Sequence, residues 1–191
     1  VQGESLLNAC IKMGADSPIR LKAVCDVWEN LNLKRAVSLL RRYGHEVSGY
    51  IDYREMLDTE KDLDAVLIAT PDFCHADQTV ACLEAGLHVY CEAPMSNTTE
   101  GARRMVQAAQ RTGKLLQIGQ QRRSNPRYRH AKTQLLDMAA LLGRMTAVNG
   151  QWHHPARPDR GWSRRLALDE ATLAKNGYAS MHQFKNWMWY K

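Results

Sequence analysis

Short apolar segments alternate with amphipathic segments through residues 1–121, and this alternation restricts the fold more than any other feature of the chain. The expected buried strands are residues 19–27, 46–52, 63–70, 87–92 and 114–120. The expected helices are residues 4–13, 33–44, 75–86 and 99–113. Such an alternation is typical of a parallel sheet with helices on both faces. We therefore predict a doubly wound α/β fold, Rossmann-like but without its first strand, in which ligands bind at the carboxyl ends of the strands.

The alternation stops near residue 121, and we place a domain boundary there. Residues 1–121 form the predicted nucleotide-binding domain, which is incomplete at its start because only Gly3 stands before the first helix. Residues 122–191 form the predicted start of a second domain. Its expected elements are a helix at 126–143, a strand at 144–154 and a loop at 155–177. The aromatic residues at 180–191 need a surface to pack against, so we expect further structure downstream.

The composition argues against two classes of partner. With 45% hydrophobic residues the chain can form an ordinary globular core. No apolar run approaches the roughly 18 residues that span a bilayer. The net charge of +6 includes basic clusters at 122–129 and 157–165, but no recognisable nucleic-acid module accompanies them. We therefore expect neither a membrane nor a nucleic acid as partner.

Cysteine and histidine usage indicates a reduced protein without a metal site. The five cysteines form no CxxC pair, and we expect buried thiols in a cytoplasmic protein. The opening residues lack the basic segment of a signal peptide, but the chain does not start with Met, so an export signal stays open. The histidines that we considered as ligands lack metal-ligand spacing. They are His130, His153, His154 and His182.

Polar residues follow several predicted strands at the end where a ligand would bind. Asp26 suits the ribose of a dinucleotide or the cap of the next helix, and sequence alone leaves both open. His75 suits a helix end or a ligand contact, and Glu92 suits a ribose contact or a turn cap. The last strand ends in Gln120, Gln121 and Arg122. We predict that these residues lie along one rim of a parallel sheet.

Tryptophans are dense in the last part of the chain. They form either the core of the second domain or stacking platforms for a sugar, and the sequence leaves both open. They are Trp152, Trp162, Trp187 and Trp189.

Residues 64–128 carry specific motifs of a known family. The run from "ATPDFCH" through "AGLHVYCEAP" to "GQQRRSNPRY" resembles the Gfo/Idh/MocA family of nicotinamide-dependent oxidoreductases. The resemblance implies an N-terminal Rossmann domain that binds NAD, and a C-terminal α/β domain whose open sheet carries the substrate and pairs into homo-oligomers. It also implies a cofactor-lining set of Gly3, Asp26, Thr70, Pro71, His75, Glu92 and Pro94.

We extend the expected cofactor-binding set by four residues, namely Gln120, Gln121, Arg122 and Trp162. Asp26 favours NAD over NADP, because a carboxylate repels a 2′-phosphate. The resemblance also exposes a departure at Ala93. The family motif there is usually Glu-Lys-Pro, with a lysine that assists proton transfer, whereas this chain has Glu92-Ala93-Pro94. The family's catalytic Asp and His are expected beyond Lys191, so no catalytic residue is assigned within the sequence.

The resemblance implies an NAD-dependent oxidoreductase that acts on a sugar or sugar derivative. Within the family, the carbohydrate-acting members are the most similar, and some of these are glycosidases that use NAD. A redox-assisted glycoside hydrolase is therefore included in the prediction. The alternative is a non-catalytic Rossmann-fold binding or scaffold protein, for which Ala93 would mark the lost activity.

Overall fold

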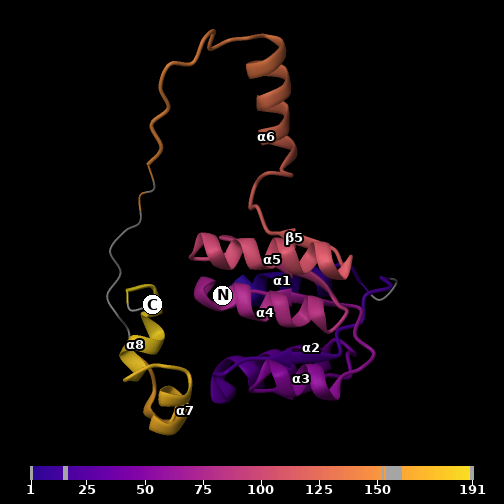
Figure 1. The fold of residues 1–191 in the computed structure, drawn as a ribbon, viewed down its shortest axis with the longest axis vertical. Coiled ribbons are helices and arrows are strands. Elements are labelled where there is room, and N and C mark those ends of the chain that lie inside the picture. Colours follow the sequence, from indigo (N-terminus) through magenta and orange to yellow (C-terminus); the bar gives the residue numbers. More distant parts are fainter. Residues whose placement is uncertain (1, 15–16, 152, 154–160, 190–191) are drawn as a thin grey trace. The chain divides into compact units, whose positions relative to one another are not determined.

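Figure 1 shows the computed structural model of the chain, which describes residues 2–14, 17–151, 153 and 161–189. These residues divide into two compact units. The first unit joins residues 1–119 with residues 162–191, and the second comprises residues 120–161. Each unit is described by itself below.

The first unit holds five short parallel strands in two sheets. They are β1 (Ala23–Cys25), β2 (Ser48–Tyr50), β3 (Ala65–Ile68), β4 (His88–Cys91) and β5 (Leu116–Ile118). One sheet pairs β1 with β2, and the other has the order β3-β4-β5. All pairs are parallel, with Val24 opposite Gly49 and Val66 opposite Val89. The predicted parallel strands are thus present, but each is shorter than its apolar run.

The two sheets match a Rossmann sheet from which one strand is missing. The dinucleotide-binding order is 3-2-1-4-5-6. If β1 and β2 take the second and third places and β3, β4 and β5 take the last three, the absent first strand falls between β1 and β3. Leu67 in the middle of β3 is 43% exposed, although strands of a covered parallel sheet are normally buried. The split sheet therefore agrees with the predicted fold that lacks its first strand.

Five α-helices accompany these strands (Figure 1). They are α1 (Gln2–Lys12), α2 (Lys34–Arg42), α3 (Tyr53–Thr59), α4 (Asp72–Glu84) and α5 (Thr99–Thr112). A π-helical turn, Glu29–Leu33, leads into α2. Thr98 caps the start of helix α5 with a side chain that accepts from the Gly101 N–H, and Gly113 caps its end with a φ of 67°, which suits a residue without a Cβ.

Helices α4 and α5 lie side by side and share the main core with the β3-β4-β5 sheet (Figure 1). Leu83, Cys91 and Met105 are fully buried there. On the outside, the Arg104 guanidinium lies 2.7 Å from the Asp77 carboxylate and ties the two helices together. Apolar burial on the inner faces is the main source of this packing.

Residues 162–189 return to the first unit and pack on the loops after β1 and β3. Their elements are a 3₁₀ turn (Arg164–Leu166), α7 (Glu170–Lys175), α8 (Met181–Lys185) and a second 3₁₀ turn (Trp187–Trp189). Trp28 donates from Nε1 to the Leu166 carbonyl at 2.6 Å. Trp28 and Phe73 join the aromatic cluster around buried Tyr178. The predicted loop at 155–177 is therefore wrong where α7 forms, while residues 155–160 lie outside the described part.

The second unit contains the helix that was predicted at 126–143, although it ends earlier. It consists of α6 (Pro126–His130) continued by a π-helical stretch (Ala131–Met138). The predicted strand at 144–154 is wrong over residues 144–151 and 153, which have no regular structure. Alternating side chains cannot form a strand without a partner edge to supply hydrogen bonds.

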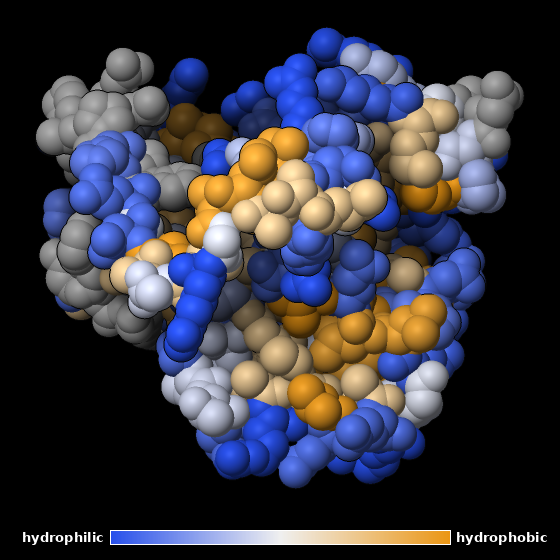
Figure 2. All heavy atoms as spheres, turned by 90° about the horizontal axis from the view of Figure 1, so that it is seen from above, coloured by the Kyte–Doolittle hydropathy of each residue, from blue (hydrophilic) through white to orange (hydrophobic). Residues whose placement is uncertain are grey.

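Apolar side chains of the second unit are exposed. They include Leu135, Leu136, Met138, Leu141, Leu142, Met145 and Val148. In Figure 2 the face seen from above carries apolar side chains among hydrophilic ones. The exposed fractions of the seven residues named above range from 41% for Leu136 to 81% for Val148.

Candidate functional site

The candidate site lies at the carboxyl ends of the strands, because each strand there leads directly into a loop with polar groups. Asp26 follows β1, Thr70 follows β3 and Glu92 follows β4. The Glu92 N–H donates to the Ile68 carbonyl and the Gly119 N–H donates to the Cys91 carbonyl, so the ends of β3, β4 and β5 are aligned. We call this edge of the first unit the strand-end rim.

Asp26 has donors on both carboxylate oxygens. Its Oδ1 accepts from the Trp28 N–H at 2.7 Å, and its Oδ2 accepts from Asn32 Nδ2 at 3.1 Å. Burial raises the pKa of Asp26, and the two hydrogen bonds oppose that rise. A carboxylate offers about four lone-pair positions, so the ribose hydroxyls of a nucleotide still have room on it. Asp26 therefore caps the turn before α2 and also fits the predicted ribose contact.

Gly3 and the start of α1 fit a diphosphate. The first backbone N–H groups of a helix have no partners within the helix and attract anions. A Cβ added at Gly3 would lie 3.6 Å from the Ala69 Cβ, so this glycine faces the end of β3. Together with Asp26, this geometry fits the NAD that the sequence predicts.

His75 is buried, and its side chain contacts two backbone carbonyl groups of the rim. Only 1% of the residue is exposed. Its Nδ1 lies 2.8 Å from the Pro94 carbonyl and its Nε2 lies 2.9 Å from the Thr70 carbonyl. Each ring nitrogen therefore lies within hydrogen-bonding distance of a backbone carbonyl, and the side chain joins the loop after β3 to the loop after β4. A direct contact between His75 and a ligand stays a prediction, and the present geometry gives the ring a positioning role.

Thr70 and Pro71 lead into α4. The Thr70 hydroxyl donates to Gln78 Oε1 at 2.6 Å. Pro71 is the N-cap residue of α4 with φ of −57°, which suits the fixed φ of proline. Both residues border the rim, where the loop backbone can face a ligand.

Glu92 is surrounded by donors from its own chain. Its Oε1 accepts from Gln2 Nε2 at 2.8 Å and from the Tyr90 hydroxyl at 3.1 Å, and its Oε2 accepts from the Ala93 N–H at 3.3 Å. Burial, followed by the negative charge of Glu92 and the hydrogen bond to it, raises the pKa of Tyr90. The Ala93 and Pro94 side chains beside Glu92 are exposed and offer no acid–base group.

The remaining predicted residues lie elsewhere in the described parts. Trp162 belongs to the first unit, packs in the aromatic cluster and has the Lys185 ammonium 5.9 Å from its ring centre. Gln120, Gln121 and Arg122 belong to the second unit. Arg122 has a left-handed φ of 70°, an uncommon conformation for a residue with a Cβ. Their predicted contact with a cofactor stays a prediction.

Sequence reasoning missed four residues that shape the rim: Gln2, Tyr90, Gly119 and Trp28. Gln2 and Gly119 each directly neighbour a predicted site residue, and this adjacency was the available signal. Tyr90 lies in β4, two positions before Glu92, and its hydroxyl reaches the Glu92 carboxylate.

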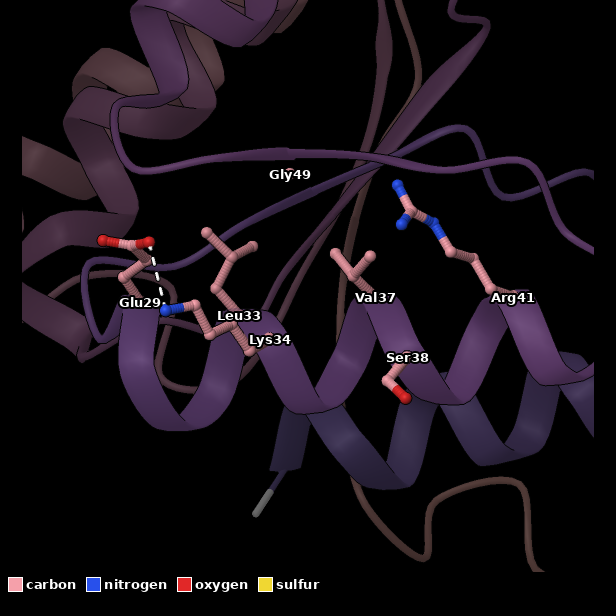
Figure 3. A pocket seen from close by; sticks show the side chains of 7 residues that line it. All are labelled: Glu29, Leu33, Lys34, Val37, Ser38, Arg41 and Gly49. Atoms are coloured by element: carbon pink, nitrogen blue, oxygen red, sulfur yellow. Dashed lines mark ion pairs between the residues drawn. The ribbon is translucent and has the colours of Figure 1, made fainter. Parts of the chain in front are cut away.

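A hollow of about 410 Å³ is lined by none of Asp26, Thr70 and Glu92 of the rim. Figure 3 shows it along one side of α2, with Leu33 and Val37 facing Gly49 of β2. The Lys34 ammonium lies 3.5 Å from the Glu29 carboxylate at its edge. A Cβ at Gly49 would lie 3.3 Å from Val37, so the glycine permits the close approach of helix and strand. The charged groups that line the hollow already have partners within the protein, and we assign no chemistry to it.

Comparison with protein families decides the classification. Residues 12–120 match the family GFO_IDH_MocA, described as an oxidoreductase family with an NAD-binding Rossmann fold. The chain belongs to this family. The predicted family and the Rossmann-like fold are thereby confirmed, and the NAD cofactor agrees with the family's description.

Individual members of the Gfo/Idh/MocA family are similar over much of this chain. An inositol 2-dehydrogenase from Salmonella typhimurium (strain LT2) is 32% identical over 139 residues, which are 72% of this chain and 39% of that protein. The WlbA dehydrogenase from Bordetella pertussis, solved with NADH and UDP-GlcNAcA, is 27% identical with a TM-score of 0.60, covering 69% of this chain and 37% of that one.

A further solved structure, myo-inositol 2-dehydrogenase from Lactobacillus plantarum, is 26% identical with a TM-score of 0.60. The match covers 73% of this chain and 39% of that one. The chain thus spans less than half the length of these relatives.

The described residues were also searched for membrane-spanning helices, metal-binding groups and disulfide bonds. None of their helices has both the length and the apolar character that a bilayer crossing needs. Within those same residues, no three His, Cys, Asp or Glu side chains are grouped so that they could hold a metal ion. None of the five cysteines is in a disulfide bond.

Proposed function

We propose that this chain is the cofactor-binding part of an NAD-dependent dehydrogenase that oxidises a secondary hydroxyl group of a sugar or cyclic polyol. The observation that carries the proposal is the strand-end rim of a Gfo/Idh/MocA member, where Asp26 and the start of α1 provide a hydroxyl acceptor and an anion site. The similar relatives act on inositol or were solved with a UDP-sugar, which supports the substrate class.

Each residue of the rim has a proposed task. Asp26 accepts hydrogen bonds from the adenosine ribose, and its charge opposes a 2′-phosphate. The first N–H groups of α1 bind the diphosphate. His75 holds the Thr70 and Pro94 carbonyls in place, so that the two loops flanking the cofactor keep a fixed spacing. Bound NAD supplies the hydride acceptor.

The proton of the substrate hydroxyl requires a base that Ala93 cannot provide. The predicted Asp and His beyond Lys191 are proposed for this task. The division at residue 121, the homo-oligomer formed through a C-terminal sheet and the cytoplasmic location are likewise proposals.

The net hydrolysis of a glycoside has no support among the relatives described above, which are dehydrogenases. A non-catalytic scaffold is a second proposal from another class, for which the motif Glu92-Ala93-Pro94 is the only support. Turnover by the natural protein with Ala93 in place would exclude it.

Calorimetry on the full-length protein tests the function directly. We expect binding of NAD and at least tenfold weaker binding of NADP. Substituting Asp26→Ala should narrow this difference, because the carboxylate that repels the 2′-phosphate is removed. NADH absorbance would then be followed with myo-inositol, glucose and UDP-N-acetylglucosamine as substrates. Absence of any binding of either dinucleotide would refute the proposal.

A further inference from the structure

Glu92 brings together three parts of the rim that are far apart in the sequence. Gln2 in the first turn of α1 and Tyr90 of β4 both donate to the same carboxylate oxygen, at 2.8 Å and 3.1 Å. The Gln2 contact spans 90 residues of sequence. It is therefore a tertiary link, because a side chain that only capped its own turn would need no partner from the first helix.

Gly119, which directly follows β5, packs against the Tyr90 and Glu92 side chains. A Cβ at that position would collide with the Tyr90 hydroxyl, and it would lie 2.9 Å from Tyr90 Cζ and 3.1 Å from Glu92 Oε2. Gly119 itself is buried. The missing side chain thus leaves the space in which the Tyr90 hydroxyl and the Glu92 carboxylate meet.

The charge balance explains why Gln2 suits its place. Its amide donates to a carboxylate without adding a positive charge beside the helix start, and hydrogen bonds to charged acceptors are stronger than neutral ones. Two donors on Oε1 and a longer backbone contact on Oε2 use three of the roughly four acceptor positions of the carboxylate. A direct ribose contact would have only the remaining position on Oε2.

We propose that Glu92 is a positioning residue, which holds the first turn of α1 at a fixed distance from the end of β4 through Gln2 and Tyr90. This inference rests on the proposed function, because that turn is the proposed diphosphate site. The spacing between α1 and β4 then sets how the diphosphate and the nicotinamide half of NAD can be bound at the same time. Glu92 thus acts on the cofactor through Gln2 and the start of α1.

The inference differs from a direct contact of Glu92 with the cofactor in one measurable respect. If Glu92 bound NAD itself, then Gln2→Met would free an oxygen and leave NAD affinity unchanged or improved. If Glu92 positions α1, the same substitution weakens NAD binding although no partner of NAD is removed. Methionine keeps the length of the side chain and removes only its polar groups.

The experiment is a double-mutant cycle on the full-length protein, with dissociation constants for NAD and for adenosine measured by calorimetry. The variants are Gln2→Met, Tyr90→Phe, Glu92→Gln and Gln2→Met/Glu92→Gln. Matched controls are Gln107→Met on α5 and Tyr43→Phe, whose side chains are exposed and lie outside the group around Glu92. Thermal melting of each apo variant reports whether the fold is retained.

We expect Gln2→Met and Glu92→Gln each to weaken NAD binding by about threefold to tenfold, which is the effect of losing one typical hydrogen bond. The double variant should be no weaker than the worse single variant, because both changes remove one shared link. Adenosine, which has no phosphate and so does not use the proposed diphosphate site at α1, should bind each variant within about twofold of its affinity for the natural protein. A merely structural defect would lower both affinities together.

The outcomes separate the two proposals. If the natural protein binds no NAD, the proposed function fails. If it binds NAD but Gln2→Met binds equally well while Glu92→Gln is weakened, Glu92 contacts the cofactor directly and the positioning role is overturned. The positioning role would also be overturned if the losses of NAD affinity in the two single variants multiplied in the double variant.

Discussion

At the scale of single residues, Ala93 is the clearest departure from the family motif and gives the first prediction. Its side chain is exposed beside Glu92, so a lysine can be accommodated without disturbing the core. We expect Ala93→Lys to leave NAD affinity within about threefold and to raise kcat at least tenfold, because a positioned proton-transfer group contributes 10²-fold or more in typical enzymes. Stopped-flow or steady-state NADH formation measures the change. An unchanged kcat would show that the proton leaves by another route.

Buried thiols give a second prediction at this scale. Burial raises the pKa of Cys82 to about 12 and that of Cys91 to about 11, from an ordinary value of 9.0. The folded protein therefore holds these protons to higher pH than the unfolded chain does. The contribution of the two thiols to stability is constant below pH 9 and is lost as pH rises from 9 to about 11 for Cys91 and about 12 for Cys82. The loss is at most about 1.4 kcal/mol per thiol for each pH unit.

Urea unfolding at pH 8 and pH 10 measures this loss. The variant Cys82→Ala is the control, because it lacks one of the titrating groups. Its free energy of unfolding should fall less between the two pH values than that of the natural protein. Identical slopes would show that other groups dominate the alkaline loss.

At the scale of elements, the segment 162–189 is held to the Rossmann unit by the Trp28 indole and the aromatic cluster around Tyr178. The variant Trp28→Phe removes the hydrogen bond to the Leu166 carbonyl and keeps an aromatic ring. We expect a loss of about 1 kcal/mol in the local stability of the segment and about fivefold faster cleavage within it by thermolysin. The core of α4, α5 and the β3-β4-β5 sheet should remain intact. Equal cleavage rates would contradict the role of Trp28.

The elements also show how much the sequence could predict. Apolar runs located all five strands, because buried parallel strands have few polar side chains. In each run, however, only some of the residues pair with a neighbouring strand. The strand at 144–154 failed because alternation describes a half-buried strand and says nothing about a partner. The short helix α7 was missed although Asp169 caps it at the Thr172 N–H, a signal that the surrounding basic residues obscured.

For the candidate site, strand ends could be predicted but side-chain partners could not. Asp26, Thr70 and Glu92 lie at strand ends as expected, because parallel strands place their carboxyl ends on one edge. The bonds that occupy His75 and Glu92 depend on Pro94 and Gln2, which the chain brings close only on folding. Such contacts decide whether a polar residue faces a ligand or the protein.

At the scale of the whole molecule, the split between the β1-β2 sheet and the β3-β4-β5 sheet leads to a last prediction. Each sheet has the strand order of one side of a Rossmann sheet, and the place between β1 and β3 fits one more parallel strand. A strand there that continued into α1 would make α1 the right-handed crossover to β1. It would also cover Leu67 and place a strand end beside the start of α1, where the diphosphate site is proposed.

We therefore expect a longer chain that extends upstream of Val1 to differ from the 191-residue chain in backbone protection. Amide hydrogen exchange at β1 and β3 should slow by at least tenfold in the longer chain, because a strand between them would pair with both edges. The amides of β5, remote from that place, are the internal control and should change little. NAD affinity should rise together with the protection, because the added strand end completes the surroundings of α1. Equal exchange at β1 and β3 in both chains would mean that the two sheets are not joined by a strand from upstream.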